Sequence, residues 1–229
     1  KDTETLYMFY VAFDGYNMPR VAMTSISMDD IFAHNWNWKP AQIITPPGVI
    51  DKSGMLFPEK IKGKYVIMHR VFPDILIDFV DTLDFPKGTY LAGEHSIKIR
   101  PNHWDSRKIG AGAPPLKTKH GWLLIYYGVD DRDASQYKMG AMLLDLNDPR
   151  QVLYRTDAPI VEPTSWYENE GHKAGIIYPC GAVIKDDSLY VYYGGADTVV
   201  CAAYAELDPF LYQLMHRKRP VLKEMAGRV

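Results

Sequence analysis

The feature that most constrains this 229-residue chain is a repeated group of short strands. Each group has an entry strand, a tight turn, a strand rich in aromatic and β-branched residues, and an outer strand. The aromatic strands begin near Tyr7, Tyr65, Leu123 and Tyr190, so the group recurs about every 60 residues. Whole groups of strands that recur at a long interval are typical of propeller blades, although most blades are nearer 40 to 50 residues. We therefore predict an all-β propeller whose extra residues lie in loops.

A β-sandwich would also contain evenly spaced strands, but it would not repeat the whole group. The segment 27–39 is expected to be a loop with about one helical turn, and the clearest helix is expected near 208–218, with Pro209 close to its start. The expected strands cover residues 6–13, 20–25, 55–61, 65–70, 75–80, 113–118, 122–127, 138–145, 178–184, 189–193 and 198–206.

Charge and composition exclude several classes of partner. The chain has 26 basic and 28 acidic side chains and a formal net charge of −2, so there is no electrostatic reason to expect nucleic acid or an anionic membrane. No apolar stretch approaches the roughly 20 residues of a membrane span. We expect neither nucleic acid nor a membrane as a partner.

The sequence also gives no sign of a metal or an organic cofactor. Cys180 and Cys201 lack the C-x-x-C spacing and are expected to be buried thiols. The glycines at 110 and 112 lack the third glycine of a dinucleotide fingerprint, and there is no P-loop ending or His-x-x-x-His pair. We therefore expect no metal and no organic cofactor.

Residues 103–115 form the stretch most suggestive of a site, because they lead into the buried strand expected at 122–127. Gly110 and Gly112 would let the backbone approach a ligand closely, and Lys108 would supply a positive charge for an anion. Taken alone, an ordinary turn with a solvated lysine explains the same residues equally well.

Three longer motifs carry a resemblance to a known family. They are WDSRKIGAGAPP at 104–115 with GWLLIY at 121–126, YPCGA at 178–182 with YYGGADT at 192–198, and LFPEK at 56–60 with YVIMHR at 65–70. With these motifs the chain resembles glycoside hydrolase family 130, which contains β-mannoside phosphorylases and related β-mannosidases. The resemblance covers essentially the whole chain and implies a five-bladed β-propeller, with residues 1–229 as a single propeller domain.

The resemblance also implies that part of the propeller is missing. Family members run longer at the N-terminus, where a Glu-Asp-Pro-Arg-like segment carries the acid that protonates the glycosidic oxygen. This sequence begins just after the place of that segment. We therefore expect a fragment that lacks at least one N-terminal blade and the general-acid aspartate, because the strand at 6–13 would otherwise have an unpaired edge.

The activity implied by the resemblance is inverting phosphorolysis of β-mannosides to mannose 1-phosphate, with inorganic phosphate as co-substrate. Phosphate must be held by cations, and Arg20, Arg70 and Lys108 lie at corresponding strand ends. The resemblance implies that these three residues bind phosphate, with hydrogen-bond partners at His69, His103 and Tyr127. Related phosphorylases often have histidine where this chain has tyrosine at 127, and tyrosine cannot carry the positive charge. For the two arginines, a structural role in pairing with a neighbouring blade is the alternative.

The same resemblance assigns residues that bind the sugar, in which carboxylates accept from vicinal hydroxyls and a ring stacks on the sugar face. These residues are Asp105, Asp197, Glu59 and Tyr178. One alternative is hydrolysis, with Glu59 or Glu170 activating a water. A second alternative is a propeller that only binds sugars or a protein.

The remaining expectations concern partners and location. The expected partner is a manno-oligosaccharide or a mannosyl disaccharide, and a homo-oligomer is expected from the family resemblance. The expected compartment is the cytoplasm, with the periplasm as the alternative.

Overall fold

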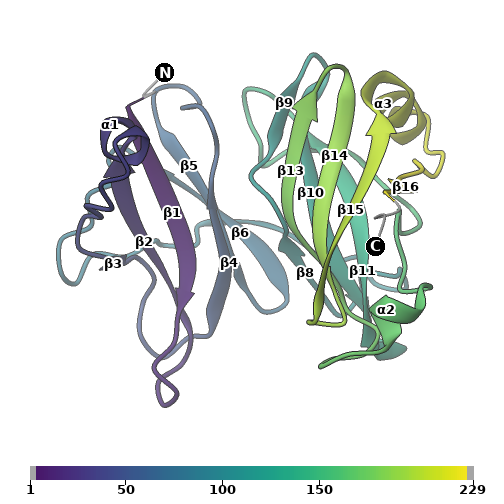
Figure 1. Cartoon of the computed structure of the whole chain (residues 1–229), viewed down its shortest axis with the longest axis horizontal. Helices are drawn as coiled ribbons and strands as arrows, with labels where there is room; N and C mark the ends of the chain where they lie inside the picture. The colour runs from purple at the N-terminus through teal and green to yellow at the C-terminus, as the bar shows by residue number, and fades with distance from the viewer. Residues whose placement is uncertain (1–3, 226–229) are drawn as a thin grey trace. The chain divides into compact units, whose positions relative to one another are not determined.

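The structure is a computed structural model that describes residues 4–225. These residues form four antiparallel sheets and three short helices (Figure 1). The chain divides into two compact units, unit 1 at Lys1–Ser96 and unit 2 at Ile97–Val229. Each unit contains two sheets, apart from the last strand of the second sheet, which ends at Ile97.

Unit 1 is built from two sheets with a core of apolar side chains. Its helix α1 (Met28–Phe32) begins at Ser27, whose side chain accepts a hydrogen bond from the Asp30 backbone N–H. The strands in sheet order are β1 (Thr5–Ala12), β2 (Arg20–Ser27) and β3 (Gln42–Ile43), then β4 (Asp51–Leu56), β5 (Tyr65–Val71), β6 (Asp74–Val80) and β7 (His95–Ile97). The core residues are Val21, Met23, Ile44, Ile67, Leu83, Phe85 and Leu91.

Unit 2 has longer strands and a larger core. Its first sheet has the order β12-β11-β10-β8, with β9 also pairing with β10, and its second has the order β13-β14-β15-β16. The strands are β8 (Lys108–Ala111), β9 (Leu116–Thr118), β10 (Gly121–Asp130), β11 (Asp133–Leu144), β12 (Val152–Arg155), β13 (Ile177–Lys185), β14 (Ser188–Gly195), β15 (Val199–Glu206) and β16 (Lys223–Glu224). The helices of this unit are α2 (Trp166–Asn169) and α3 (Leu207–Met215).

Helix α3 completes the core of unit 2. Phe210, Leu211 and Leu214 lie on one face of this helix and pack with residues such as Leu143 and Val191. Figure 1 shows α3 following β15 directly. The helix expected near 208–218 therefore runs from 207 to 215, and the chain turns at Arg217, which has a φ of 54°.

Tight turns explain why the strands pair in the observed register. The β13–β14 hairpin has Asp186 and Asp187 as its two loop residues, with φ values of 49° and 58°. Two consecutive residues with positive φ match the right-handed twist of the flanking strands, and aspartate tolerates this conformation better than most residues. The turn therefore fixes Lys185 opposite Ser188 and sets the hairpin register.

The all-β class predicted from the repeated strands is confirmed. The first hairpin, expected at 6–13 and 20–25, is β1 and β2, and the aromatic strands beginning near 65, 123 and 190 are β5, β10 and β14. The described residues contain four blade-like sheets, one for each repeat. A fifth blade and the single domain over 1–229 stay predictions, and residues 1–3 and 226–229 lie outside the described residues.

Candidate functional site

His69 lies at the centre of a buried row of charged residues across three strands of unit 1. Its Nδ1 lies 2.6 Å from Asp51 Oδ2 on β4, and its Nε2 lies 2.8 Å from Asp78 Oδ2 on β6. Burial lowers the pKa of His69, but hydrogen bonds and the charges of both carboxylates outweigh burial and raise the pKa to about 9. The ring is therefore a cation that holds two carboxylates together. Both ring nitrogens are engaged, so we leave His69 out of the phosphate ligands proposed below.

Arg70 follows His69 on β5 and, because side chains alternate along a strand, points to the other face of the sheet. Arg70 is only 9% exposed, and its Nε has no hydrogen-bond partner among residues 4–225. A buried donor without a partner typically costs about 1 to 3 kcal/mol, and more when it is charged. A bound anion would satisfy this donor, and a guanidinium matches the geometry of a phosphate group.

Arg20 lies at the same end of the unit 1 sheets as Arg70. The Asp51 N–H donates to the Pro19 carbonyl at 2.9 Å, and the next residue, Lys52, is the register partner of Arg70. The Arg20 guanidinium already donates from Nε to the Thr45 carbonyl at 2.8 Å and from Nη2 to the same oxygen. It also lies over the Tyr90 ring, 5.1 Å from the ring centre. Glu59 lies away from this end, half-buried in the loop between β4 and β5.

In unit 2, Lys108 sits beside a group of three tyrosine rings. Its Nζ donates to Tyr137 Oη and lies 4.4 Å from the centre of that ring. The Tyr137 ring stacks on Tyr127 at 5.6 Å between centres, and Tyr127 in turn lies 4.9 Å from Tyr178. Lys173 adds a second ammonium over Tyr137, at 5.5 Å. The structure therefore brings three of the predicted residues, Lys108, Tyr127 and Tyr178, into one cationic and aromatic cluster.

The two glycines next to Lys108 have a packing role that sequence alone does not reveal. A Cβ on Gly110 would lie 2.3 Å from Tyr127 Oη, and a Cβ on Gly112 would lie 2.3 Å from Pro179 Cγ. These distances are far below van der Waals contact, so both positions must be glycine for the chain to pack this closely. The sequence predicts that these glycines let the backbone approach a ligand. In the structure, the space beside them is filled by the side chains of Tyr127 and Pro179.

Asp105 is fully buried, and protein groups already occupy its carboxylate. Oδ1 accepts from Arg100 Nε at 3.1 Å, and Oδ2 accepts from Arg100 Nη2 at 3.0 Å and from Tyr126 Oη at 2.8 Å. Arg155 Nη2 donates to the same Oδ2. With 0% exposure and both oxygens engaged, Asp105 holds Arg100, Arg155 and Tyr126 in place instead of facing a sugar.

Three other predicted residues lie on the surface of unit 2. Asp197 is exposed in the β14–β15 turn, where its φ is 52°. His103 is exposed, and its Nδ1 lies 3.0 Å from the Pro101 carbonyl oxygen. Glu170 is exposed at the end of α2. None of the three belongs to the tyrosine cluster given above.

Sequence reasoning missed four residues that the structure places in buried or stacked positions. Asp51 and Asp78 could not be paired with His69 because strand register is not readable from the sequence. Tyr137 stacks on Tyr127 only because β10 and β11 pair in the observed register, with Tyr127 opposite Met139. Glu168 could have been found, because Ser165 precedes it in the S-x-x-E pattern of a helix start.

Glu168 is fully buried at the start of α2. Its Oε2 accepts from the backbone N–H groups of Thr164 and Ser165, each at 2.9 Å, and its Oε1 accepts from Tyr193 Oη at 3.1 Å. Burial, with the nearby Glu168 charge, raises the pKa of Tyr193 well above its usual value. Glu168 therefore ties α2 to β14 as a structural carboxylate.

The described part of the chain contains neither a metal-binding cluster nor a helix that could span a membrane. Residues 4–225 contain no group of three or more His, Cys, Asp or Glu side chains that could hold a metal ion. Across the same residues, no helix has the length and apolar character needed to cross a membrane.

Comparison with known proteins agrees with these features. The family model of glycoside hydrolase family 130, described as beta-1,4-mannooligosaccharide phosphorylase, matches residues 2–216. A 1,2-beta-oligomannan phosphorylase from Thermoanaerobacter is 48% identical over 69% of this chain and 51% of its own length. A beta-1,2-mannobiose phosphorylase from the same organism is 40% identical over 88% of this chain and 63% of its own length. This chain therefore spans roughly half to two thirds of these relatives.

The solved structures agree with the sequence comparison. The beta-1,2-mannobiose phosphorylase of Listeria innocua, solved in complex with beta-1,2-mannobiose, superposes with a TM-score of 0.79 and 32% identity. The superposition covers 93% of this chain and 58% of the Listeria chain, which supports the all-β propeller fold. Because the family model matches nearly all of its residues, this protein belongs to glycoside hydrolase family 130.

Proposed function

We propose that this chain carries out, as part of its enzyme, the inverting phosphorolysis of β-mannosides to mannose 1-phosphate. Its family and the phosphorylase names of its curated relatives support this proposal. The structural observation that carries the phosphate part is Arg70, a buried arginine whose Nε has no partner among residues 4–225. A carboxylate that activates water would not require such a donor.

The chemistry explains why cations are needed. A phosphate oxygen attacks the anomeric carbon of the mannosyl unit, the bond to the glycosidic oxygen breaks, and an acid gives the leaving oxygen a proton. The attacking phosphate is an anion, so basic side chains must hold it. We propose Arg20 and Arg70 in unit 1 and Lys108 in unit 2 as these residues, with Tyr127 and His103 as hydrogen-bond donors.

For the sugar we propose Asp197 and Tyr178 as contacts. We leave out Asp105 because its oxygens are already engaged, and Glu59 because it lies at the opposite end of the unit 1 strands from Arg20 and Arg70. The two Thermoanaerobacter relatives and the Listeria protein are named for β-1,2-linked substrates. We therefore propose a β-1,2-linked manno-oligosaccharide as the first substrate to test. Hydrolysis with Glu59 or Glu170 as base remains the alternative within the family.

The decisive assay incubates the full-length enzyme with β-1,2-mannobiose, with and without inorganic phosphate, and measures mannose 1-phosphate and free mannose. The proposal predicts mannose 1-phosphate only when phosphate is present. Free mannose formed at the same rate without phosphate would instead identify a hydrolase.

Phosphate binding can be measured separately from turnover, by ³¹P NMR titration of three variants. Arg70→Gln and Lys108→Gln should each weaken binding about tenfold or more, because each removes a charge-assisted hydrogen bond worth about 1.5 to 3 kcal/mol. Arg107→Gln is the matched control, since Arg107 is 45% exposed beside Lys108 and pairs with Asp131. Equal binding by all variants would remove these residues from the proposed site.

The other expectations are proposed together with this function. We propose that the complete propeller has five blades in one domain, that inorganic phosphate is the co-substrate without an organic cofactor, and that the enzyme acts in the cytoplasm as a homo-oligomer. The family resemblance supports the five blades and the homo-oligomer. The lack of a dinucleotide fingerprint or a P-loop in the sequence supports the proposal that no organic cofactor is used.

A further inference from the structure

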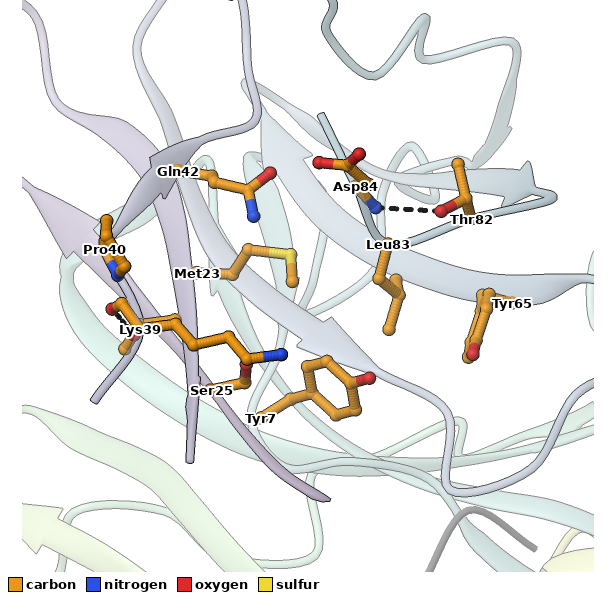
Figure 2. Close-up of a pocket in the computed structure, with 11 residues that line it drawn as sticks. Tyr7, Met23, Ser25, Lys39, Pro40, Gln42, Tyr65, Thr82, Leu83 and Asp84 are labelled. Carbon is orange, nitrogen blue, oxygen red and sulfur yellow. Dashed lines mark hydrogen bonds between the residues drawn. The ribbon is translucent and has the colours of Figure 1, made fainter. Parts of the chain in front are cut away.

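Unit 1 contains a pocket that the proposed reaction does not use (Figure 2). It is a cavity of about 340 Å³, within the range of roughly 300 to 1,000 Å³ that is usual for small-molecule sites. Its lining comes from β1, β2, β3 and β5, from the segment before β3 and from the loop after β6. All of these segments belong to unit 1.

The pocket is at the opposite end of the strands from Arg20 and Arg70. Ser25, near the end of β2, and Tyr65, at the start of β5, both line it. Arg20 is at the start of β2, and Arg70 is near the end of β5. A ligand in the pocket would therefore be separated from these two cations by the length of the strands.

The walls combine an apolar floor with polar groups around it. Met23 and Leu83, which are 2% and 8% exposed, belong to the unit 1 core and form apolar surface in the pocket. In Figure 2 the Lys39 side chain extends toward the Tyr7 ring, and the Tyr65 ring lies on the other side of Leu83. Rings beside apolar side chains offer a surface for the C–H face of a ligand.

The polar groups include both donors and acceptors. Gln42 Oε1 accepts the Phe85 backbone N–H at 2.7 Å, which leaves the Gln42 amide NH₂ as a donor. Lys39 supplies an exposed ammonium, and Asp84 supplies an exposed carboxylate, so the pocket has no single sign of charge. The Asp84 backbone N–H donates to Thr82 Oγ1 at 3.0 Å, which fixes the loop that carries the carboxylate.

We propose that this pocket binds a neutral saccharide of one or two hexose units. A sugar ring has an apolar C–H face and hydroxyls that both donate and accept, which matches tyrosine rings, apolar floor, ammonium, amide and carboxylate together. The Asp84 carboxylate would repel a bound anion, and the Lys39 ammonium would repel a bound cation. The choice of a mannoside as the probe rests on the proposed function, whereas the chemical class does not.

The test uses ¹³C-methyl methionine labelling of the whole chain. Met23 lies in the pocket, and Met142 lies in the unit 2 core, where it is 0% exposed. Titration with β-1,2-mannobiose without phosphate should shift the Met23 methyl signal in a saturable way and leave the Met142 signal unchanged. The Met23 signal is assigned with Met23→Leu.

Variants tie the signal to the pocket. Tyr7→Ala should weaken binding about tenfold, or about 1.4 kcal/mol, which is near the upper end of the roughly 0.5 to 1.5 kcal/mol of an aromatic contact. Tyr10→Ala is the matched control, because Tyr10 is on the same strand with its side chain on the opposite face, and it should keep binding within about twofold. Lys39→Ala changes an exposed residue and should also weaken binding, which keeps the test valid if Tyr7→Ala does not fold.

Two outcomes would overturn the proposal. One is no saturable Met23 shift with the saccharide, and the other is a Met23 shift with sodium phosphate but not with the saccharide, which would make the pocket an anion site. Failure of the proposed phosphorolysis is distinguishable, because the Arg70→Gln protein should still show the Met23 shift with mannobiose.

Discussion

At the scale of single residues, the proton on His69 stabilises the second sheet of unit 1. The ring bridges two buried carboxylates that would repel each other if it were neutral. The pKa of Asp78 is correspondingly lowered, since burial, which raises it, is outweighed by the bonds from His69 and from the Gly93 and Ala92 N–H groups. The row therefore works as a charged unit over the middle of the pH range.

The sign of the pH effect follows from these shifts. The pKa of His69 is raised from 6.5 to about 9, so its contribution is fully present below pH 6.5 and is lost as pH rises through 9. We expect the free energy of unfolding to fall by about 2 kcal/mol between pH 7 and pH 9.5 from this group. The lowered pKa of Asp78 adds stability that is present above its unfolded pKa and lost in acid.

Urea unfolding at both pH values tests this expectation. His69→Gln should abolish the fall in the free energy of unfolding between pH 7 and pH 9.5. It should also destabilise the protein at pH 7 by about 3 to 5 kcal/mol, because it leaves two buried carboxylates without a cation. The exposed His120 provides the control, and His120→Gln should keep the wild-type pH dependence. If the free energy of unfolding had the same pH dependence in His69→Gln and wild type, a group other than His69 would be responsible for it.

At the scale of strands, close packing of Trp104 requires glycine in β10 and β11. A Cβ on Gly140 would lie 2.6 Å from Trp104 Cζ2 and 2.7 Å from Tyr126 Cε1, and a Cβ on Gly128 would lie 2.6 Å from Trp104 Cζ3. The Trp104 ring also lies 5.5 Å from the Tyr126 ring, centre to centre. These contacts leave no room for a methyl group on either strand.

We therefore expect Gly140→Ala to destabilise the protein by about 1 to 3 kcal/mol, since it forces extra volume into a packed site. Gly194 on β14 is the matched control, because nothing lies within 4 Å of its added Cβ and its φ is not positive. Gly194→Ala should be neutral or slightly stabilising. The midpoints of urea unfolding compare the two, and equal midpoints would contradict the packing argument.

The same elements show what the sequence can and cannot predict. Strand alternation and turn residues place β1, β2, β5, β10 and β14 correctly, because these signals are local. The charged row at His69 forms only because Asp51 and Asp78, which are 18 and 9 residues away in the sequence, lie on neighbouring strands. Gly110 likewise depends on a ring from the adjacent strand β10. Such contacts are set by strand register, which the sequence leaves open.

At the scale of the whole molecule, each unit has its own core. Val21, Ile44 and Ile67 are in the core of unit 1, whereas Leu143 and Val191 are in that of unit 2. A protein with separate cores can open one unit while the other stays folded. The stability of each unit should therefore respond mainly to changes in its own core.

Amide hydrogen exchange measures this directly. Ile67→Ala removes a fully buried side chain and should destabilise unit 1 by about 2 to 5 kcal/mol, so amides of β2 and β5 should exchange faster while those of β10 and β14 change little. Leu143→Ala, also fully buried, should speed exchange in β10 and β14 and spare β2 and β5. Equally faster amide exchange in all four strands in either variant would mean that the two cores unfold as one cooperative unit. Opening one unit would then cost as much free energy as global unfolding.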